Sequence, residues 1–119
     1  MIKVGLIGYG YWGSNLLRNF IANPAIEVLA VADPSEARRA EARRSAPSAC
    51  ICESGEEVIA LPDVDAVAIA TPVANHYPLA RQALESAKHV LVEKPMSCTV
   101  EEGEHLIELA VRNLSLIHI

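Results

Sequence analysis

The sequence predicts an α/β protein with a Rossmann-type, doubly wound parallel sheet, and three observations support this. An apolar strand, Ile2–Ile7, runs directly into a G-x-G-x-x-G pattern at residues 8–13. A second apolar strand, Ile26–Ala32, ends at an acidic residue, Asp33. Beyond it, strand-like and helix-like segments alternate, which indicates a parallel sheet with helices on its faces. The three features together are the pattern by which such folds bind a dinucleotide.

The three glycines of the first turn each have a separate task in such a site. Gly8 permits a tight turn, Gly10 lets the backbone approach a pyrophosphate, and Gly13 lets the following helix lie close to the strand. The helix that begins there presents free N–H groups and the positive end of its dipole to phosphates. A plain strand-to-helix turn is the alternative, and Asp33 argues against it. The contacts predicted from this turn are made by Gly8, Tyr9, Gly10, Tyr11, Trp12 and Gly13.

Asp33 is expected to bind the ribose of the adenosine half. Its carboxylate can accept hydrogen bonds from the ribose hydroxyls, and its charge would repel a 2′-phosphate. We therefore expect NAD as the cofactor and NADP as the less favoured one. Arg38 and Arg39 follow closely, and their positive charges oppose this preference. An N-cap role for Asp33 at the next helix is compatible with ribose binding.

The other elements follow from apolar periodicity and from turn residues. We expect the helix after the glycine turn at about Ser14–Asn23, ended by Pro24. Asn75 is a candidate N-cap, and Thr99-Val100-Glu101-Glu102 has the spacing of a capping box. The remaining expected strands are 49–52, 66–70 and 89–92, and the remaining helices are 35–45, 56–60, 76–86 and one that opens at residue 99.

These elements make five strands of a six-stranded fold, so we expect the last strand and a C-terminal α+β domain to be missing. The fifth strand would then be an exposed apolar edge of the sheet. The final residues, 114–119, break the apolar stripe of the last helix. They are also the translation of CTG-TCT-CTT-ATA-CAC-ATC, a transposase adaptor used in DNA library preparation. We therefore expect an incomplete dinucleotide-binding domain at 1–113 and a non-native tail at 114–119.

Composition narrows the class of protein further. A chain of 119 residues forms one domain, and ten basic against fifteen acidic residues give a net charge of −5, which argues against nucleic-acid binding. No apolar run approaches the roughly 20 residues of a membrane span. The first apolar stretch continues into the glycine turn instead of forming a signal peptide, so we expect a cytoplasmic protein. Cys50, Cys52 and Cys98 are expected to be reduced, small apolar residues and not metal ligands.

Polar residues follow the fourth and fifth predicted strands at the same edge of the sheet. Thr71, Pro72 and His76 come after the fourth strand, on the side expected for the nicotinamide and its ribose. From spacing alone, His76 belongs either to that site or to the surface. Glu93 and Lys94 end the fifth strand, where a charged pair is costly unless it is solvated or used. Lys94 is either a proton donor and acceptor for a substrate oxygen or the partner of Glu93 in an ion pair.

These segments resemble the glucose–fructose oxidoreductase/inositol dehydrogenase (Gfo/Idh/MocA) family. The resemblance covers Ile2 to about Asn113, and its motifs are Gly8–Gly13, Asp33, Asp65-Ala66-Val67 leading to Thr71-Pro72 and His76, and Lys88–Pro95. Its most specific part is Glu93-Lys94-Pro95. The resemblance implies the NAD(P)-binding N-terminal half of a sugar or polyol oxidoreductase, whose full-length parent is usually a homo-oligomer.

The resemblance also implies roles for individual residues. Lys94 would contact the nicotinamide ribose and the substrate and would assist proton transfer. Glu93 would lie by the same ribose, and Thr71, Pro72 and His76 would line the cofactor.

The chain departs from the family pattern at two positions. Ser14 stands where close relatives often have proline, and Ala87 stands where the family commonly has glycine. If position 87 is left-handed, alanine costs about 1 kcal/mol there.

The predicted function is hydride transfer between nicotinamide and a sugar or polyol carbon, with Lys94 as the acid/base. Family members have a second domain that supplies further substrate-facing groups, and none of it is in this sequence. Proximity and orientation contribute on the order of 7–11 kcal/mol to such reactions, so we expect no turnover from these residues alone. The alternative is a non-catalytic dinucleotide-binding or sensing module. An S-adenosylmethionine-binding domain is less favoured, because that fold has no need of Glu93-Lys94-Pro95.

Overall fold

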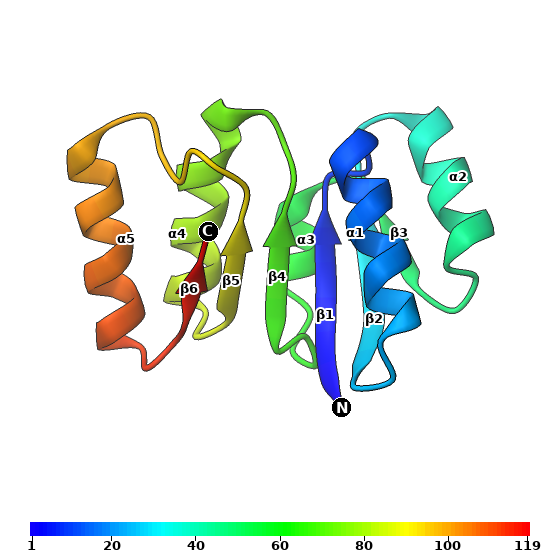
Figure 1. Cartoon of the computed structure of the whole chain (residues 1–119), viewed down its shortest axis with the longest axis horizontal. Helices are drawn as coiled ribbons and strands as arrows, with labels where there is room; N and C mark the ends of the chain where they lie inside the picture. The colour runs from blue at the N-terminus through cyan, green and yellow to red at the C-terminus, as the bar shows by residue number, and fades with distance from the viewer.

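Six parallel strands form one sheet in the order β3-β2-β1-β4-β5-β6 (Figure 1). The structure is a computed structural model that describes all of residues 1–119. The strands are β1 (Ile2–Ile7), β2 (Ile26–Ala32), β3 (Cys50–Cys52), β4 (Ala66–Ile69), β5 (His89–Val92) and β6 (Ile117–His118). The chain crosses from β3 to β4, so β1 and β4 become neighbours although five elements separate them in sequence. The predicted doubly wound parallel sheet is confirmed.

Helices cover both faces of the sheet. They are α1 (Tyr11–Ala22), α2 (Glu36–Ser45), α3 (Gly55–Ile59), α4 (His76–Glu85) and α5 (Val100–Arg112), with a 3-10 turn, η1 (Val73–Asn75), before α4. Helices α1 and α2 lie on one face, and α3, α4 and α5 lie on the other (Figure 1). None of these helices is long and apolar enough to cross a membrane.

The core has two parts because neighbouring strand residues point to opposite faces. Leu6 of β1 belongs to a cluster of seven buried residues under α1 and α2. Ile7, the next residue, belongs to a cluster of 18 buried residues under α3, α4 and α5. The strands are buried on both sides, which explains why their sequences are continuous apolar runs and not alternating ones.

Helix starts differ from the predictions in ways that affect the site. Helix α1 begins at Tyr11, three residues before the predicted Ser14, so the glycine turn is its first turn. At α2 the N-cap is Ser35, whose Oγ accepts from the N–H of Arg38 at 3.3 Å, so the N-cap role considered for Asp33 is wrong. Asn75 precedes α4 but makes no capping hydrogen bond with its side chain, because η1 already turns the chain there.

The predicted cap of the last helix is confirmed with one shift. Thr99 Oγ1 accepts from the N–H of Glu102 at 3.1 Å. The Glu102 carboxylate accepts from the N–H of Cys98 at 3.0 Å, one residue before the N-cap, and not from Thr99 itself.

The expected absence of a sixth strand is wrong. Ile117 and His118 pair in parallel with Val90 and Leu91, and the N–H of Val90 donates to the carbonyl of Leu116 at 2.8 Å. The prediction missed this strand because two residues have no detectable periodicity and because 114–119 were set aside as a tail. The division of the chain at residue 113 stays a prediction.

Ala87 has a left-handed backbone with φ of 60°, between α4 and β5. The side chain of an L-residue in this conformation crowds the following carbonyl oxygen and costs about 1–2 kcal/mol. The strain inferred from the departure at this position is therefore present.

Candidate dinucleotide site

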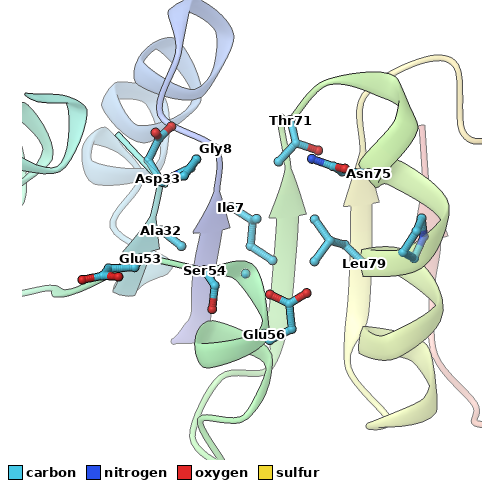
Figure 2. A pocket seen from close by; sticks show the side chains of 13 residues that line it. Ile7, Gly8, Ala32, Asp33, Glu53, Ser54, Glu56, Thr71, Asn75 and Leu79 are labelled. Atoms are coloured by element: carbon cyan, nitrogen blue, oxygen red, sulfur yellow. The ribbon is translucent and has the colours of Figure 1, made fainter. Parts of the chain in front are cut away.

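Two hollows lie side by side along the carboxyl edge of the sheet. The first, which we name the β1–β2 pocket, has a volume of about 260 Å³ and is lined by Gly8, Asp33, Ser54, Thr71 and Asn75, among others (Figure 2). The second, the β4–β5 pocket, has a volume of about 360 Å³ and is lined by Trp12, Ala70, Thr71, Val73, His76, Glu93 and Lys94. Both hollows share Thr71. They meet between β1 and β4, the point at which the strand order reverses and where such sheets bind ligands.

Two glycines of the first turn are required by its geometry. Gly8 has φ of +100°, and a Cβ there would overlap the main-chain carbonyl of Ala70. A Cβ on Gly13 would overlap the carbonyl oxygen of Gly8, so α1 can approach the strand only without a side chain at that position. The tasks predicted for Gly8 and Gly13 are confirmed.

Gly10 differs from the other two because the fold itself leaves room for a side chain there. It is the N-cap of α1 with φ of −82°, and a Cβ would meet only the Arg38 guanidinium at an ordinary 3.5 Å. The first turn of α1 carries no acidic side chain, and no side chain caps its N–H groups. The N-terminus of this twelve-residue helix is a suitable place for a phosphate.

Asp33 joins the glycine turn to the start of α2. Its Oδ2 accepts from the N–H of Tyr9 at 2.8 Å, and its Oδ1 accepts from the N–H of Ser35 at 2.8 Å. The side chain is only 4% exposed, yet it borders the β1–β2 pocket (Figure 2). Each carboxylate oxygen has a second lone pair, so both can accept a further hydrogen bond from a ligand hydroxyl.

The two arginines after Asp33 are arranged differently. Arg39 donates through Nη1 to the carbonyls of Asp33 and Pro34, at 3.0 and 2.9 Å, and thereby holds the turn before α2. Arg38 is half-exposed, and its Nη1 lies 3.9 Å from Asp33 Oδ2. Arg38 is therefore the positive charge beside the Asp33 carboxylate, although it is not among the residues that line the pocket.

The other residues predicted from the glycine turn divide into a buried and an exposed group. Tyr9 is buried against α2, and its hydroxyl lies 3.1 Å from Ser45 Oγ, so its side chain stabilises the fold. Tyr11 and Trp12 are 76% and 63% exposed and pack edge to face with ring centres 5.2 Å apart. Trp12 forms part of the β4–β5 pocket.

His76 is buried at the start of α4, so the surface alternative is wrong. Its Nδ1 lies 2.7 Å from the carbonyl of Pro95, and its Nε2 lies 2.8 Å from the carbonyl of Thr71. The ring borders the β4–β5 pocket, but both of its polar atoms are engaged by main-chain groups. Pro72 lies between Thr71 and η1 and is not among the residues that line either pocket.

Glu93 and Lys94 lie together on the β4–β5 pocket, directly after β5. The N–H of Glu93 donates to the carbonyl of Ile69 at 3.1 Å, which extends the pairing with β4 by one residue. The ion pairs of the molecule involve neither residue, so the alternative of a Glu93–Lys94 ion pair at the loop mouth is wrong. Lys94 is exposed and lines the pocket, and its ammonium group takes part in no ion pair.

Sequence reasoning missed the wall that α3 contributes to the β1–β2 pocket. Glu53, Ser54 and Glu56 line it, and Ser54 also caps α3 by accepting from the N–H of Glu57 (Figure 2). The signal was available, because the carboxyl ends of all parallel strands meet at one edge and these residues follow β3 directly.

The cysteines of β3 are free and touch each other, with Sγ atoms 3.8 Å apart. Burial, followed by the hydrogen bond with Cys50, raises the pKa of the Cys52 thiol to about 12. A thiol that holds its proton at neutral pH is a weak nucleophile and a weak metal ligand.

The fold and the two pockets define a dinucleotide-binding domain of the Rossmann class. The sequence matches the family described as "Oxidoreductase family, NAD-binding Rossmann fold" over residues 2–119. The chain belongs to this Gfo/Idh/MocA family of NAD(P)-dependent oxidoreductases, as the resemblance predicted.

Similar proteins are about three times longer than this chain. It is 36% identical to "Uncharacterized oxidoreductase YdgJ" of Escherichia coli, over 98% of this chain and 34% of that protein. It is 35% identical to "scyllo-inositol 2-dehydrogenase (NADP(+)) IolW" of Bacillus subtilis, over 88% of this chain and 29% of that protein. Biliverdin reductase from Synechocystis sp. PCC 6803, solved with biliverdin and NADP+, aligns with a TM-score of 0.94 and 29% identity, over 98% of this chain and 37% of that one.

Proposed function

We propose that these residues are the N-terminal, dinucleotide-binding part of an NAD-dependent oxidoreductase that acts on a sugar, a polyol or a related compound. The observation that carries this proposal is the free ammonium of Lys94 on the pocket next to the glycine turn. The chain spans about a third of the length of the curated relatives it matches, so the activity belongs to the proposed longer protein.

The two pockets fit the two halves of the cofactor. The pyrophosphate would lie at Gly10 and the first turn of α1, where N–H groups are free. The adenosine would enter the β1–β2 pocket, with its ribose hydroxyls on Asp33. The nicotinamide and its ribose would lie in the β4–β5 pocket by Glu93 and Lys94.

Lys94 would act as the acid/base of the reaction. The nicotinamide, when bound, takes up or supplies the hydride at the substrate carbon. In the reduction of a ketone, protonated Lys94 would donate its proton to the substrate oxygen while the neighbouring carbon gains the hydride. In the oxidation of an alcohol, neutral Lys94 would accept the hydroxyl proton, so atoms and charge balance in both directions.

The preference for NAD over NADP is part of the proposal and rests on charge. Asp33, Glu53 and Glu56 place three carboxylates on the β1–β2 pocket, and they would repel a 2′-phosphate. Arg38 is the opposing charge, whereas Arg39 is committed to main-chain carbonyls. A homo-oligomeric parent and a cytoplasmic location stay predictions.

The direct test is Lys94→Met in the full-length parent. We expect kcat to fall by about 10²–10⁴, the usual contribution of a positioned acid/base, while NAD binding changes little. Lys3→Met, at the opposite end of the sheet, is the matched control and should leave kcat unchanged. Near-normal turnover in Lys94→Met would remove Lys94 from the chemistry. A parent that binds NAD but turns over none of a panel of polyols and sugars would favour the alternative, a binding or sensing module.

A further inference from the structure

The ring of His76 faces two hydrogen-bond acceptors and no donor. Its Nδ1 lies 2.7 Å from the Pro95 carbonyl and its Nε2 lies 2.8 Å from the Thr71 carbonyl. Main-chain carbonyls can only accept, and a neutral imidazole can donate from one nitrogen alone. The doubly protonated ring is the form that satisfies both contacts, because the neutral ring would set a nitrogen lone pair against an oxygen lone pair.

The two carbonyls belong to the loops that follow two neighbouring strands, and the β4–β5 pocket is lined by Thr71 of one loop and Lys94 of the other. Thr71 follows β4, and Pro95 follows β5 and is the neighbour of Lys94 in sequence. The ring is 2% exposed and sits at the first residue of α4, a helix that packs in the larger core. His76 therefore connects both loops to a rigid element.

The segment after β5 has few other anchors. The pairing with β4 ends at the N–H of Glu93, and the next main-chain hydrogen bond is that of Cys98 to the Glu102 carboxylate. Between these two points, the contact of the Pro95 carbonyl with His76 is the one hydrogen bond to another element. Met96 adds an apolar contact with the core, which holds the far end of the segment.

We propose that His76 is a positioning residue that, in its doubly protonated form, ties the Glu93–Pro95 segment, which carries Lys94, to the Thr71 loop. The charged groups that share its pocket are Glu93 and Lys94, whereas α1 and η1 contribute Trp12 and Val73, which do not titrate. The effect on catalysis rests on the function proposed above. The contact of His76 with the loop does not depend on that function, so it can be tested on these 119 residues without any ligand.

The first measurement uses the unmodified chain and nitrogen NMR of the histidine ring. We expect both ring nitrogens of His76 to carry protons when Lys94 and Met96 have the backbone order parameters of rigid structure, about 0.85. A ring with one bare nitrogen beside an ordered segment would overturn the proposal.

The second measurement compares His76→Gln with a control histidine. His105→Gln removes the 2.6 Å contact between Tyr77 and His105, which joins α4 to α5 without touching either loop. We expect His76→Gln, but not His105→Gln, to lower the order parameters of Lys94 and Met96. Equal order in both variants would contradict the proposal.

The last measurement addresses catalysis in the full-length parent. A misplacement of about 1 Å can reduce a rate about 10²-fold, so His76→Gln should lower kcat by about that factor and change the Kd for NAD less than about threefold. A mobile segment with an unchanged kcat would overturn the positioning role. An inactive unmodified parent would instead count against the proposed function, and the loop measurements would still decide the hydrogen-bonding role of His76.

Discussion

The β1–β2 pocket and the β4–β5 pocket are built in different ways. Main-chain geometry forms the first: a left-handed Gly8, a close approach at Gly13, and Asp33 fixed by two backbone N–H groups. Exposed side chains form much of the second, including Trp12 and Lys94. The fold itself therefore fixes the shape of the β1–β2 pocket, whereas the β4–β5 pocket is shaped largely by side chains that few contacts hold in place.

The largest expected effect separates binding from folding within the glycine turn. Gly10→Ala should leave the free energy of unfolding within about 0.5 kcal/mol, because the structure has room for the new Cβ. NAD affinity should nevertheless fall tenfold or more, because a pyrophosphate must approach this backbone. Calorimetry of NAD binding and urea unfolding measure the two quantities.

Gly13→Ala is the contrasting variant for that experiment. Its Cβ overlaps the Gly8 carbonyl, so we expect a loss of about 1–3 kcal/mol in unfolding free energy as well as weaker binding. If Gly10→Ala bound NAD like the unmodified chain, the phosphate would not lie where we propose.

A smaller effect is expected on the choice between NAD and NADP. Asp33→Asn removes the negative charge beside the ribose, so NAD affinity should fall about tenfold while NADP affinity falls less. The asparagine side chain has only one oxygen, so its NH₂ group would face one of the two backbone N–H groups that Asp33 accepts from. The lost hydrogen bond should cost about 1–3 kcal/mol of stability. Binding titrations with both cofactors give the ratio.

Arg38→Ala provides the opposite change of charge beside Asp33. It removes the positive charge 3.9 Å from Asp33, so NADP affinity should fall by a few fold and NAD affinity should hold. Equal losses of both cofactors in Asp33→Asn would argue against the ribose contact.

The smallest expected effect lies away from both pockets. Ala87→Gly should stabilise the chain by about 0.5–1 kcal/mol, because glycine relieves the left-handed strain. The greater conformational freedom of glycine in the unfolded chain offsets part of this gain. Thermal unfolding measures this, and NAD affinity should not change. A stabilised chain with altered NAD binding would mean that the α4–β5 turn is coupled to the site.

The parts of the fold that sequence predicted are those with long apolar runs or turn residues of defined geometry. Strands β1, β2 and β5 start and end at the predicted residues, since Gly8, Asp33 and Glu93 mark where each apolar run stops. Strand β6 was not predicted, because two residues are too few to show an apolar periodicity. The predicted start of α1 is three residues late because a glycine pattern indicates a turn and does not show that Gly10 is also the N-cap of the helix.

The candidate site shows a sharper limit. The ends of the strands predicted which residues line the pockets. They did not predict which hydrogen bonds those residues make. The contact of Tyr9 with Ser45 and the contact of His76 with the Pro95 carbonyl join residues 36 and 19 positions apart in sequence, which no local pattern contains. The same holds for Arg38 and Arg39, which are neighbours in sequence with different partners.

The central claim is that this chain binds a dinucleotide across its glycine turn, and Trp12 offers the most direct test. It is the single tryptophan of the chain and lies on the β4–β5 pocket. We predict that NADH quenches the Trp12 emission with saturation and gains sensitised emission of its own, and that Gly10→Ala weakens both. If circular dichroism shows that the chain is folded and its Trp12 emission does not change with millimolar NADH, the claim is contradicted.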